Sequence, residues 1–419
     1  MGSNESLAYS DSSHPLSYNL SWMQSITDST KLSQMTIPGT HNSCALHGIC
    51  CAQTQSWSLP EQMKAGLRFF DIRLRLYNNT LRAFHEFVDQ KDTFDKILSY
   101  ALDFLEQNPS ESIIYEIITE NKAKNCEKSM PEMYEEYTKD IKDKIIEYKN
   151  KDVTMGDIRG KILMINVFGR STKFIPGFLI QNYWSVKWRF DINKKKRKIK
   201  ENIHRALAFK NDDRIFLNYL SCSSDYAMMT PYTAAKKCNE IALRYKGRLG
   251  IVLMDYPGEI LIKHLIEQNA LLNKNDLIDK AIIKNGDLVY IIHNDTQKYL
   301  YLDENNIENK IYCSKNAMGL TIKHKSDNIN RDYFMENDTI LLVGKNDYQY
   351  EFTIMNIYDS KDNILYDNSL FKLQISDNEG NKYLENKYEN KNNKKQYLFE
   401  RNNKPGNFES YFSIQKILE

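Results

Sequence analysis

Five side chains that can move protons or bind phosphate lie near the ends of apolar runs in the first 260 residues: His41, Asp71, Arg73, His85 and Asp255. Imidazoles titrate near pH 6.5, so one histidine can take a proton at neutral pH while another gives one. A guanidinium matches the shape and charge of a phosphate. Two histidines with an arginine between them are therefore a set suited to acid–base cleavage of a phosphodiester.

The segment 35–43 (MTIPGTHNS) would place the first histidine at the end of a strand. Proline fixes φ and glycine tolerates positive φ, so Pro38 and Gly39 predict that the strand stops there in a tight turn. The turn would aim His41 out of the strand end, where a proton-transfer group is useful. An ordinary polar turn residue is the alternative.

The segment 69–75 (FFDIRLR) predicts a strand with one charged face. Its period of two puts Asp71, Arg73 and Arg75 on the side opposite the apolar residues. Inward-facing charges are costly unless they pair or meet a ligand. We therefore expect Arg73 to be held for a phosphate. An internal ion pair between Asp71 and Arg73 remains the alternative.

The other two candidates follow β-like runs. His85 lies in RAFHEF, where a lone histidine among aromatic residues can also be an ordinary core residue. Asp255 ends the run GIVLMD, with Pro257 just behind it. A carboxylate in this place can orient a histidine and stabilise its protonated form. An N-cap for the following helix is the competing interpretation.

Apolar β-like runs alternate with helical patterns over residues 34–272. The predicted strands are 34–38, 68–76, 112–119, 161–168, 215–220 and 249–256, and the predicted helices are 60–65, 92–107, 132–148, 194–208, 232–244 and 260–272. Continuous Ile/Val/Leu strands between amphipathic helices predict a parallel sheet covered by helices. Six or more such units predict an α/β fold, a (β/α) barrel of irregular form, with its chemistry at the carboxyl ends of the strands.

The pattern changes near residue 275, where short β-like runs separated by Asn, Asp, Gly and Lys take over. Runs of the form LTI, FKL and FSI recur at intervals of 51 and 41 residues. A threefold repeat of short strands predicts an all-β domain, a β-trefoil, over 281–419, after a barrel domain over 1–275. A small β-sandwich without a repeat is the alternative.

Composition narrows the class of protein. The formal net charge of +2 over 419 residues argues against a chain that seeks nucleic acid as a whole. No apolar run reaches 18 residues, and the polar first residues predict no signal peptide, so we expect a soluble protein. The seven cysteines suggest mostly free thiols, and the spacing Cys44-x2-His47-x2-Cys50-Cys51 matches no common zinc module.

One local feature suits a membrane surface. Aromatic residues cluster between 183 and 190, just before a basic run of Lys194, Lys195, Lys196 and Arg197. Aromatic side chains beside basic ones are typical of docking on anionic lipid, so we expect Tyr183, Trp188 and this run to contact the membrane. A solvated helix face with buried tryptophans is equally compatible with the pattern.

Five segments together resemble bacterial-type phosphatidylinositol-specific phospholipase C, the X-domain phosphodiesterases, over residues 18–272. They are IPGTH at 37–41, EQMKAGLRFFDIR at 61–73, NPSESII at 108–114, GDIRGKI at 156–162 and MDY at 254–256. The resemblance implies a distorted TIM barrel. It also implies cleavage of phosphatidylinositol to diacylglycerol and inositol 1,2-cyclic phosphate, with glycosylphosphatidylinositol anchors as a further candidate substrate.

The resemblance also implies residue roles. His41 would be the general base on the inositol 2-hydroxyl, oriented by Asp255, and His85 the general acid towards diacylglycerol. Arg73 would bind the phosphate within a polar cluster that includes Asp71. The inositol-contacting positions are matched by Arg170, Asn182 and Trp184, and Asn42, beside the general base, would be a further substrate-binding residue.

This sequence departs from the family pattern in three places. Asn42 stands where the bacterial enzymes have an aspartate that supports the general acid. An inositol-contacting lysine is replaced near Ile118, and Asn182 and Trp184 stand for an aspartate and a tyrosine. Calcium-dependent relatives also have His-Asn, but Arg73 occupies the place of one of their calcium-binding acids. A fixed cation there makes calcium unnecessary, so we expect neither a metal nor another cofactor.

The sequence therefore predicts a metal-independent phospholipase C that acts as a monomer on phosphatidylinositol in anionic membrane surfaces, with a C-terminal module for carbohydrate or protein. Another phosphodiesterase of the same barrel class, such as a glycerophosphodiesterase, is one rival. A degenerate barrel that only binds lipid beside a lectin module is another. The combination of His41, Arg73, His85 and Asp255 argues against the second rival, because a binding protein needs no acid–base pair.

Overall fold

The computed structural model describes residues 8–149, 152–169, 174–186, 191–208, 213–224 and 229–271, and beyond these the strands from Leu288 onward. The chain forms two compact units. The first comprises residues 1–206 and 211–274, and the second comprises 207–210 and 275–419. All candidate catalytic residues belong to the first unit.

Eight parallel strands form the sheet of the first unit. In spatial order they are β6 (Ile145–Glu147), β7 (Ile162–Gly169), β5 (Ile113–Thr119), β2 (Phe69–Tyr77), β1 (Ile37–Thr40), β10 (Ile251–Met254), β9 (Ile215–Tyr219) and β8 (Phe178–Gln181). The described pairings do not join β6 to β8, so the barrel is incomplete on that side. The predicted parallel α/β fold is confirmed.

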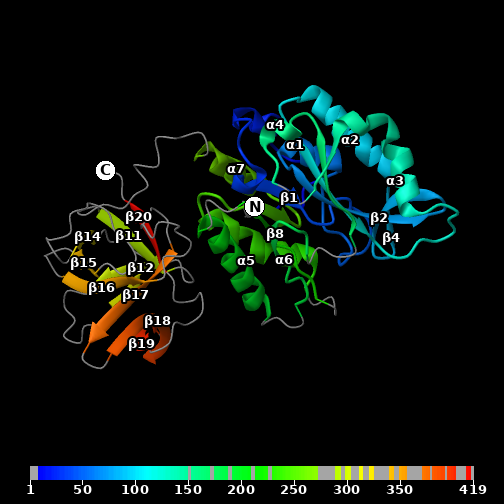
Figure 1. The fold of residues 1–419 in the computed structure, drawn as a ribbon. Coiled ribbons are helices and arrows are strands. Elements are labelled where there is room, and N and C mark those ends of the chain that lie inside the picture. The colour runs from blue at the N-terminus through cyan, green and yellow to red at the C-terminus, as the bar shows by residue number, and fades with distance from the viewer. Residues whose placement is uncertain are drawn as a thin grey trace. The chain divides into compact units, whose positions relative to one another are not determined.

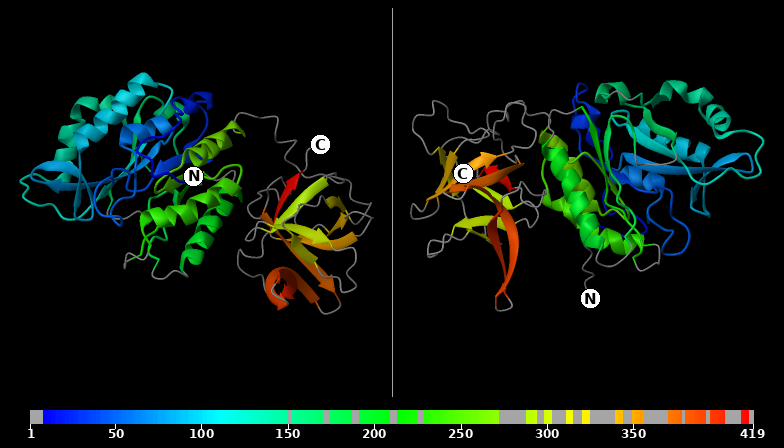
Figure 2. Two further views of the ribbon diagram at one scale, coloured as in Figure 1. Left: turned by 180° about the vertical axis from the view of Figure 1, so that it is seen from behind. Right: turned by 60° about the horizontal axis from the view of Figure 1, so that its bottom comes forward.

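Helices flank this sheet, with α2 and α3 beside the β2 half and α5 and α6 beside the β8 half (Figure 1). Figure 2 shows the same arrangement from two further sides. The helices are α1 (Leu59–Ala65), α2 (Phe94–Gln107), α3 (Met130–Thr138), α4 (Met155–Ile158), α5 (Asp191–Ala208), α6 (Pro231–Cys238) and α7 (Glu259–Glu267). Short 3-10 helices complete the described elements: η1 (Trp22–Ser25), η2 (Leu32–Gln34), η3 (Lys139–Lys144), η4 (Asn239–Arg244) and η5 (Gln268–Leu271).

The core lies between the sheet and these helices because the strands are apolar on both faces. Every residue of β1, β9 and β10 is buried. Ile37, Leu217 and Leu253 belong to one hydrophobic cluster that also receives the N-terminal segment through Met23 and Met35. Burial of such side chains contributes roughly 1.5–3 kcal/mol each, which fixes the strand ends that carry the candidate site.

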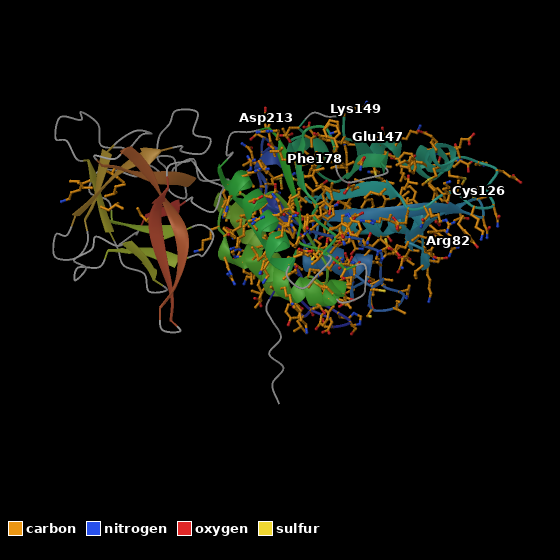
Figure 3. The ribbon with its side chains drawn as sticks, turned by 90° about the horizontal axis from the view of Figure 1, so that it is seen from below. Arg82, Cys126, Glu147, Lys149, Phe178 and Asp213 are labelled. Carbon is orange, nitrogen blue, oxygen red and sulfur yellow. The ribbon has the colours of Figure 1, made fainter. Side chains whose placement is uncertain are left out.

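An antiparallel hairpin extends β2 beyond the parallel sheet. Its strands are β3 (Thr80–His85), which pairs with β2, and β4 (Val88–Thr93), which pairs with β3. Arg82 of this hairpin and Asp213, just before β9, lie at opposite sides of the unit (Figure 3). The hairpin brings His85 back towards the carboxyl ends of the parallel strands.

The predicted turn at Pro38 and Gly39 is wrong, because β1 continues through both residues to Thr40. A Cβ on Gly39 would lie 2.6 Å from the Phe69 carbonyl oxygen and 2.6 Å from Leu253 Cδ2. Glycine is thus required here for close approach of β2 and β10, and not for a positive φ. The strand itself then delivers His41 to the sheet edge.

Two further element predictions need correction. The helix predicted over 132–148 is present only as far as Thr138, the last residue of α3. Ile145 and Ile146 instead pair in parallel with β7. These β-branched residues fit a pleated sheet edge better than a helix interior. Strand β8 was not predicted, because its run FLIQ is too short to give a clear period.

The described strands of the second unit pair antiparallel throughout. They are β11 (Leu288–His293), β12 (Lys298–Leu302), β13 (Ile311–Ser314), β14 (Leu320–His324), β15 (Thr339–Val343), β16 (Gln349–Met355), β17 (Leu370–Asp377), β18 (Gly380–Lys391), β19 (Lys394–Asn402) and β20 (Phe412–Lys416). The β-trefoil arrangement and the ligand of this unit remain predictions.

Among the described residues, no helix is both long enough and apolar enough to cross a bilayer.

Candidate active site

The predicted residues come together at the carboxyl ends of the parallel strands. His41 follows β1 directly and Asp255 follows β10, which pairs with β1 in register up to Thr40 and Met254. Asp71 and Arg73 lie on β2, the strand on the other side of β1. The neighbouring strand ends thus place a histidine, two carboxylates and a guanidinium around one point.

His41 is held through both ring nitrogens. Its Nδ1 lies 2.8 Å from Asp255 Oδ1, and its Nε2 lies 3.1 Å from Arg73 Nη2. A guanidinium has only donors, so the His41 Nε2 must accept, and Nδ1 then carries the hydrogen that is donated to Asp255. This tautomer leaves the lone pair of Nε2 pointing towards Arg73, ready to take a proton from a substrate that displaces the arginine.

Burial sets the electrostatics of this pair. It lowers the pKa of His41 well below the usual range, and the adjacent Arg73 charge lowers it further. Burial also raises the pKa of the Asp255 carboxyl, which the charges of His85, Lys195 and Arg73 oppose. His41 is consequently neutral at pH 7, the state that a general base needs.

Carboxylates hold the Arg73 guanidinium, but they do not use all of its hydrogen-bonding capacity. Its Nε and Nη2 donate to the two oxygens of Asp71 at 3.3 and 3.2 Å, while Nη1 lies 3.7 Å from Glu120 Oε2. Burial alone would lower the pKa of Arg73, but Asp71 and Glu120 raise it, so the guanidinium stays charged. Its side chain is 22% exposed, so a ligand can reach it.

His85 ends β3 and takes its support from the backbone. Its Nδ1 donates to the Ala52 carbonyl oxygen at 2.5 Å, which leaves Nε2 to face a substrate. The charge of protonated His85 acts on the pKa of both His41 and Asp255, as expected of groups that share one site. Two imidazoles therefore face the same site with different supports, a carboxylate for His41 and a carbonyl for His85.

Asn42 does not support His85. Its backbone N–H donates to Asp71 Oδ2 at 3.3 Å, and its side-chain Oδ1 is buried without a hydrogen-bond partner. The Ala52 carbonyl performs the supporting contact instead. Asn42 thus helps to hold Asp71, and an unpartnered amide oxygen remains buried beside the His41 strand end.

Each of three site residues, His41, His85 and Asp255, is followed by a residue in the left-handed region. The φ angles are 44° at Asn42 after His41, 51° at Glu86 after His85 and 44° at Tyr256 after Asp255. Positive φ is rare outside glycine and costs about 1–3 kcal/mol for residues held in it. The chain therefore turns sharply after each of the three, which aims their side chains into the site. Of the three residue types, asparagine tolerates this region most readily.

The predicted substrate loop is only partly described. Asn182 and Trp184 follow β8, and Trp184 is 49% exposed. The Tyr183 backbone N–H donates to Gln181 Oε1 at 2.7 Å, and Lys194 Nζ lies 5.0 Å from the Tyr183 ring centroid. Arg170 and Trp188 lie outside the described residues.

The predicted membrane contact through Lys195 is wrong. The residue is fully buried, and its Nζ donates to the Tyr219 carbonyl oxygen at 2.6 Å. The reason is the helical period of α5, which places it on the inward row with Ile192, Ile199, Asn202, Ile203 and Ala206. Lys194 and Arg197 are exposed and Lys196 is half-buried, so these three remain candidates for the surface.

Sequence reasoning missed Glu116 and Tyr219. Glu116 on β5 is level with Asp71 on β2 and accepts hydrogen bonds from Tyr219 Oη at 2.9 Å and Asn166 Nδ2 at 3.1 Å. Burial raises the Glu116 pKa to about 8, and the nearby Asp71 charge adds to this rise. A single carboxylate inside the apolar run IIYEIIT was the signal that could have identified it.

Within the described residues, no group of three or more His, Cys, Asp or Glu side chains is placed to hold a metal ion. The cysteines near His47 differ in environment, because Cys44 is buried while Cys50 is exposed. Neither forms a disulfide.

Comparison with known proteins identifies similar chains. Residues 28–142 match the PI-PLC X family model. A 1-phosphatidylinositol phosphodiesterase of Listeria monocytogenes is 29% identical over 281 residues, which cover 59% of this chain and 84% of that protein. A protein of the same name from Staphylococcus aureus is 25% identical over 292 residues, 59% of this chain and 93% of that protein.

The solved structures agree with these matches. The structure of phosphatidylinositol-specific phospholipase C from Listeria monocytogenes has a TM-score of 0.52 and 27% sequence identity, and it covers 60% of this chain and 99% of its own. The predicted resemblance is confirmed, as is the prediction that the chain is an enzyme.

Proposed function

The first unit of this chain resembles bacterial phosphatidylinositol-specific phospholipase C, and from that premise we propose that the chain cleaves phosphatidylinositol. The products would be diacylglycerol and inositol 1,2-cyclic phosphate. The observation that carries the proposal is the chain of contacts from Asp255 through His41 to Arg73, which pairs an oriented neutral base with a phosphate-binding cation.

In the proposed reaction, the substrate phosphate takes the place of His41 at Arg73, and the inositol 2-hydroxyl approaches His41 Nε2. His41 removes the hydroxyl proton while the 2-oxygen bonds to phosphorus. The bond from phosphorus to the glycerol oxygen breaks, and His85 Nε2–H gives a proton to that leaving oxygen. Arg73 stabilises the negative charge around phosphorus.

The attacking group is already part of the substrate, so this step needs positioning and proton transfer more than a new nucleophile. Asp255 stabilises the imidazolium that forms on His41. The permanent charge of Arg73 next to His41 supplies the positive charge that a metal ion would otherwise provide. We therefore propose that turnover is independent of divalent metal.

The surface that meets the membrane is proposed from exposed apolar residues on the loops at this end of the sheet. Ile49 lies after β1, Phe87 lies between β3 and β4, and Trp184 lies after β8, with exposed fractions of 71%, 81% and 49%. Large apolar side chains left exposed together are typical of interaction surfaces. Lys194 and Arg197 would add attraction to anionic headgroups.

The boundaries proposed for the two domains are 1–275 for the phospholipase barrel and 281–419 for the β-trefoil-like module. The two compact units support a division near residue 275. The antiparallel pairing of the described C-terminal strands supports an all-β module. Its ligand would be a carbohydrate or a protein.

The proposed function is tested by incubating the chain with phosphatidylinositol vesicles in EDTA and following inositol phosphates by ³¹P NMR. We expect inositol 1,2-cyclic phosphate to appear, and its formation to stop in His41→Ala and in His85→Ala. Turnover that requires added Ca²⁺ would contradict the metal-free mechanism. Cleavage of glycerophosphodiesters alone would support the related phosphodiesterase instead, and no cleavage at all would support a binding protein.

A further inference from the structure

The Tyr219 ring packs against the imidazole of His41, the proposed general base. It is the last residue of β9, it is fully buried, and it pairs in register with Leu253 of β10, two residues before Asp255. Its ring meets the His41 ring edge to face, with centroids 5.8 Å apart and planes at 79°. Such a contact contributes about 0.5–1.5 kcal/mol and depends on the relative tilt of the rings.

Three elements hold this tyrosine at its two ends. Its hydroxyl donates to Glu116 Oε2 on β5 at 2.9 Å. Its carbonyl oxygen accepts from Lys195 Nζ on α5 at 2.6 Å and from Gln181 Nε2 on β8 at 2.9 Å. Burying an ammonium and a carboxyl group costs free energy that an apolar core would avoid. Their convergence on one residue beside the base therefore points to a role besides packing.

The hydrogen bonds at the two ring nitrogens of His41 do not fix the tilt of the imidazole ring. Asp255 and Arg73 hold the two ring nitrogens, and contacts at these two atoms leave rotation of the ring about the line through Nδ1 and Nε2. Rotation of the ring about that line is limited by what packs against its face or edge. The Tyr219 ring supplies this contact.

We propose that Tyr219 is a positioning residue for the reaction, in which Glu116 and Lys195 fix the tyrosine so that its ring sets the orientation of the His41 imidazole. This inference rests on the proposed function, because it gives His41 the role of general base.

The central test is Tyr219→Phe, which keeps the ring and removes the hydroxyl bond to Glu116. The matched control is Tyr115→Phe, because Tyr115 is also fully buried and its hydroxyl donates to the Ile97 carbonyl oxygen at 2.9 Å. With phosphatidylinositol vesicles in EDTA, we expect kcat to fall about tenfold in Tyr219→Phe with KM within twofold. The control should keep kcat within twofold.

A second measurement follows the titration of the His41 ring by NMR, assigned with His41→Ala. We expect the His41 pKa to rise towards 6.5 in Tyr219→Phe, because looser packing of the ring admits water, and to stay unchanged in Tyr115→Phe. This readout needs no turnover. If the chain does not cleave phosphatidylinositol, the titration still decides whether Tyr219 positions His41.

Glu116 variants keep the inference testable if Tyr219→Phe fails to fold. Glu116→Gln preserves an acceptor for the tyrosine hydroxyl, so kcat and the His41 titration should stay near the wild-type values. Glu116→Leu removes that acceptor and should reproduce the tenfold loss. Equal kcat and an equal His41 titration in Tyr219→Phe and Tyr115→Phe, or in the two Glu116 variants, would overturn the proposal.

Discussion

Two arginines, one just before strand β2 and one in its middle, are held in opposite ways. Arg68, just before the strand, donates to Glu111 Oε2 through Nε at 3.0 Å and fills its remaining donors with four carbonyl oxygens, those of Asn19, Leu20, Met63 and Leu67. Arg73, inside the strand, has its donors shared among Asp71, His41 and a distant Glu120.

Exposure follows the same division. Arg68 and Glu111 are both completely buried, whereas the Arg73 side chain is 22% exposed. A guanidinium whose five donors all bond to protein has nothing left for a ligand. A charged group inside the protein therefore indicates a ligand-binding site only where the protein does not satisfy all of its hydrogen-bond donors. We refer to the Arg68 side as the closed end and to the Arg73 side as the open end.

The largest expected effect is the loss of activity when a proton-transfer residue at the open end is removed. His41→Ala and His85→Ala should each lower kcat about 10²–10⁴-fold, because each removes one proton-transfer group. Melting temperatures should stay within a few degrees of the wild type, since neither side chain is fully buried. Activity assays in EDTA and thermal unfolding measure the two quantities. A variant that retained wild-type kcat would contradict its assigned role.

The next largest expected effect is the loss of stability when the ion pair at the closed end is broken. Arg68→Met leaves the Glu111 carboxylate buried without its partner, which should cost about 3–5 kcal/mol of unfolding free energy. The double variant Arg68→Met, Glu111→Leu should recover much of this loss, because apolar side chains replace the whole pair. Urea unfolding of both variants measures the difference. Equal stability of the single and double variants would show that the ion pair is not the reason for the loss.

A smaller expected effect concerns how the stability depends on the buried carboxyl groups of Glu116 and Glu111. Glu116 has a raised pKa, so it contributes stability that is present below pH 4.5 and lost as the pH rises towards about 8. Glu116→Gln should therefore gain stability relative to the wild type as the pH rises from 5 to 8. Glu111→Gln should lose stability at pH 7, because Arg68 then lacks an anion. Thermal unfolding across this pH range measures both, and a flat difference for Glu116→Gln would contradict the assignment.

The smallest effect concerns the surfaces of the two ends. Trp184→Ala should weaken binding to anionic vesicles about tenfold, since one large apolar side chain contributes roughly 1.5–3 kcal/mol when buried. Leu20→Ala is the control, because Leu20 is comparably exposed, at 42% against 49%, and its carbonyl lies at the closed end. Vesicle sedimentation measures binding. Equal losses in the two variants would place the membrane surface elsewhere.

Much of this architecture could be predicted from local patterns. The alternation in FFDIRLR placed Asp71 and Arg73 on one face, and that side of β2 does carry the site. The order of strands and helices predicted the parallel sheet, because each apolar run is long enough to show its period. Arg68, next to the same strand, gave no signal of its own, since most of its partners are backbone carbonyls, which no side-chain pattern reports.

The contacts that depend on tertiary structure could not be predicted. Lys195 belongs to a basic run that suggests an exposed surface, and only the packing of α5 shows that it points inward. The support of His85 by the Ala52 carbonyl involves a backbone atom, which no side-chain pattern reports. Glu116 and Tyr219 are 103 residues apart in the chain, and β2, β1 and β10 separate their strands in the sheet, so only the curvature of the sheet brings the two side chains together.

The most direct test of the contrast between the two ends is a crossed pair of substitutions, Arg68→Lys and Arg73→Lys, measured for both melting temperature and kcat/KM. Lysine keeps the charge and loses the planar fork in both places. We predict that Arg68→Lys lowers the melting temperature and leaves kcat/KM of the folded protein within twofold, whereas Arg73→Lys lowers kcat/KM at least tenfold with little change in melting temperature. Parallel losses of stability and activity in both variants would contradict the account.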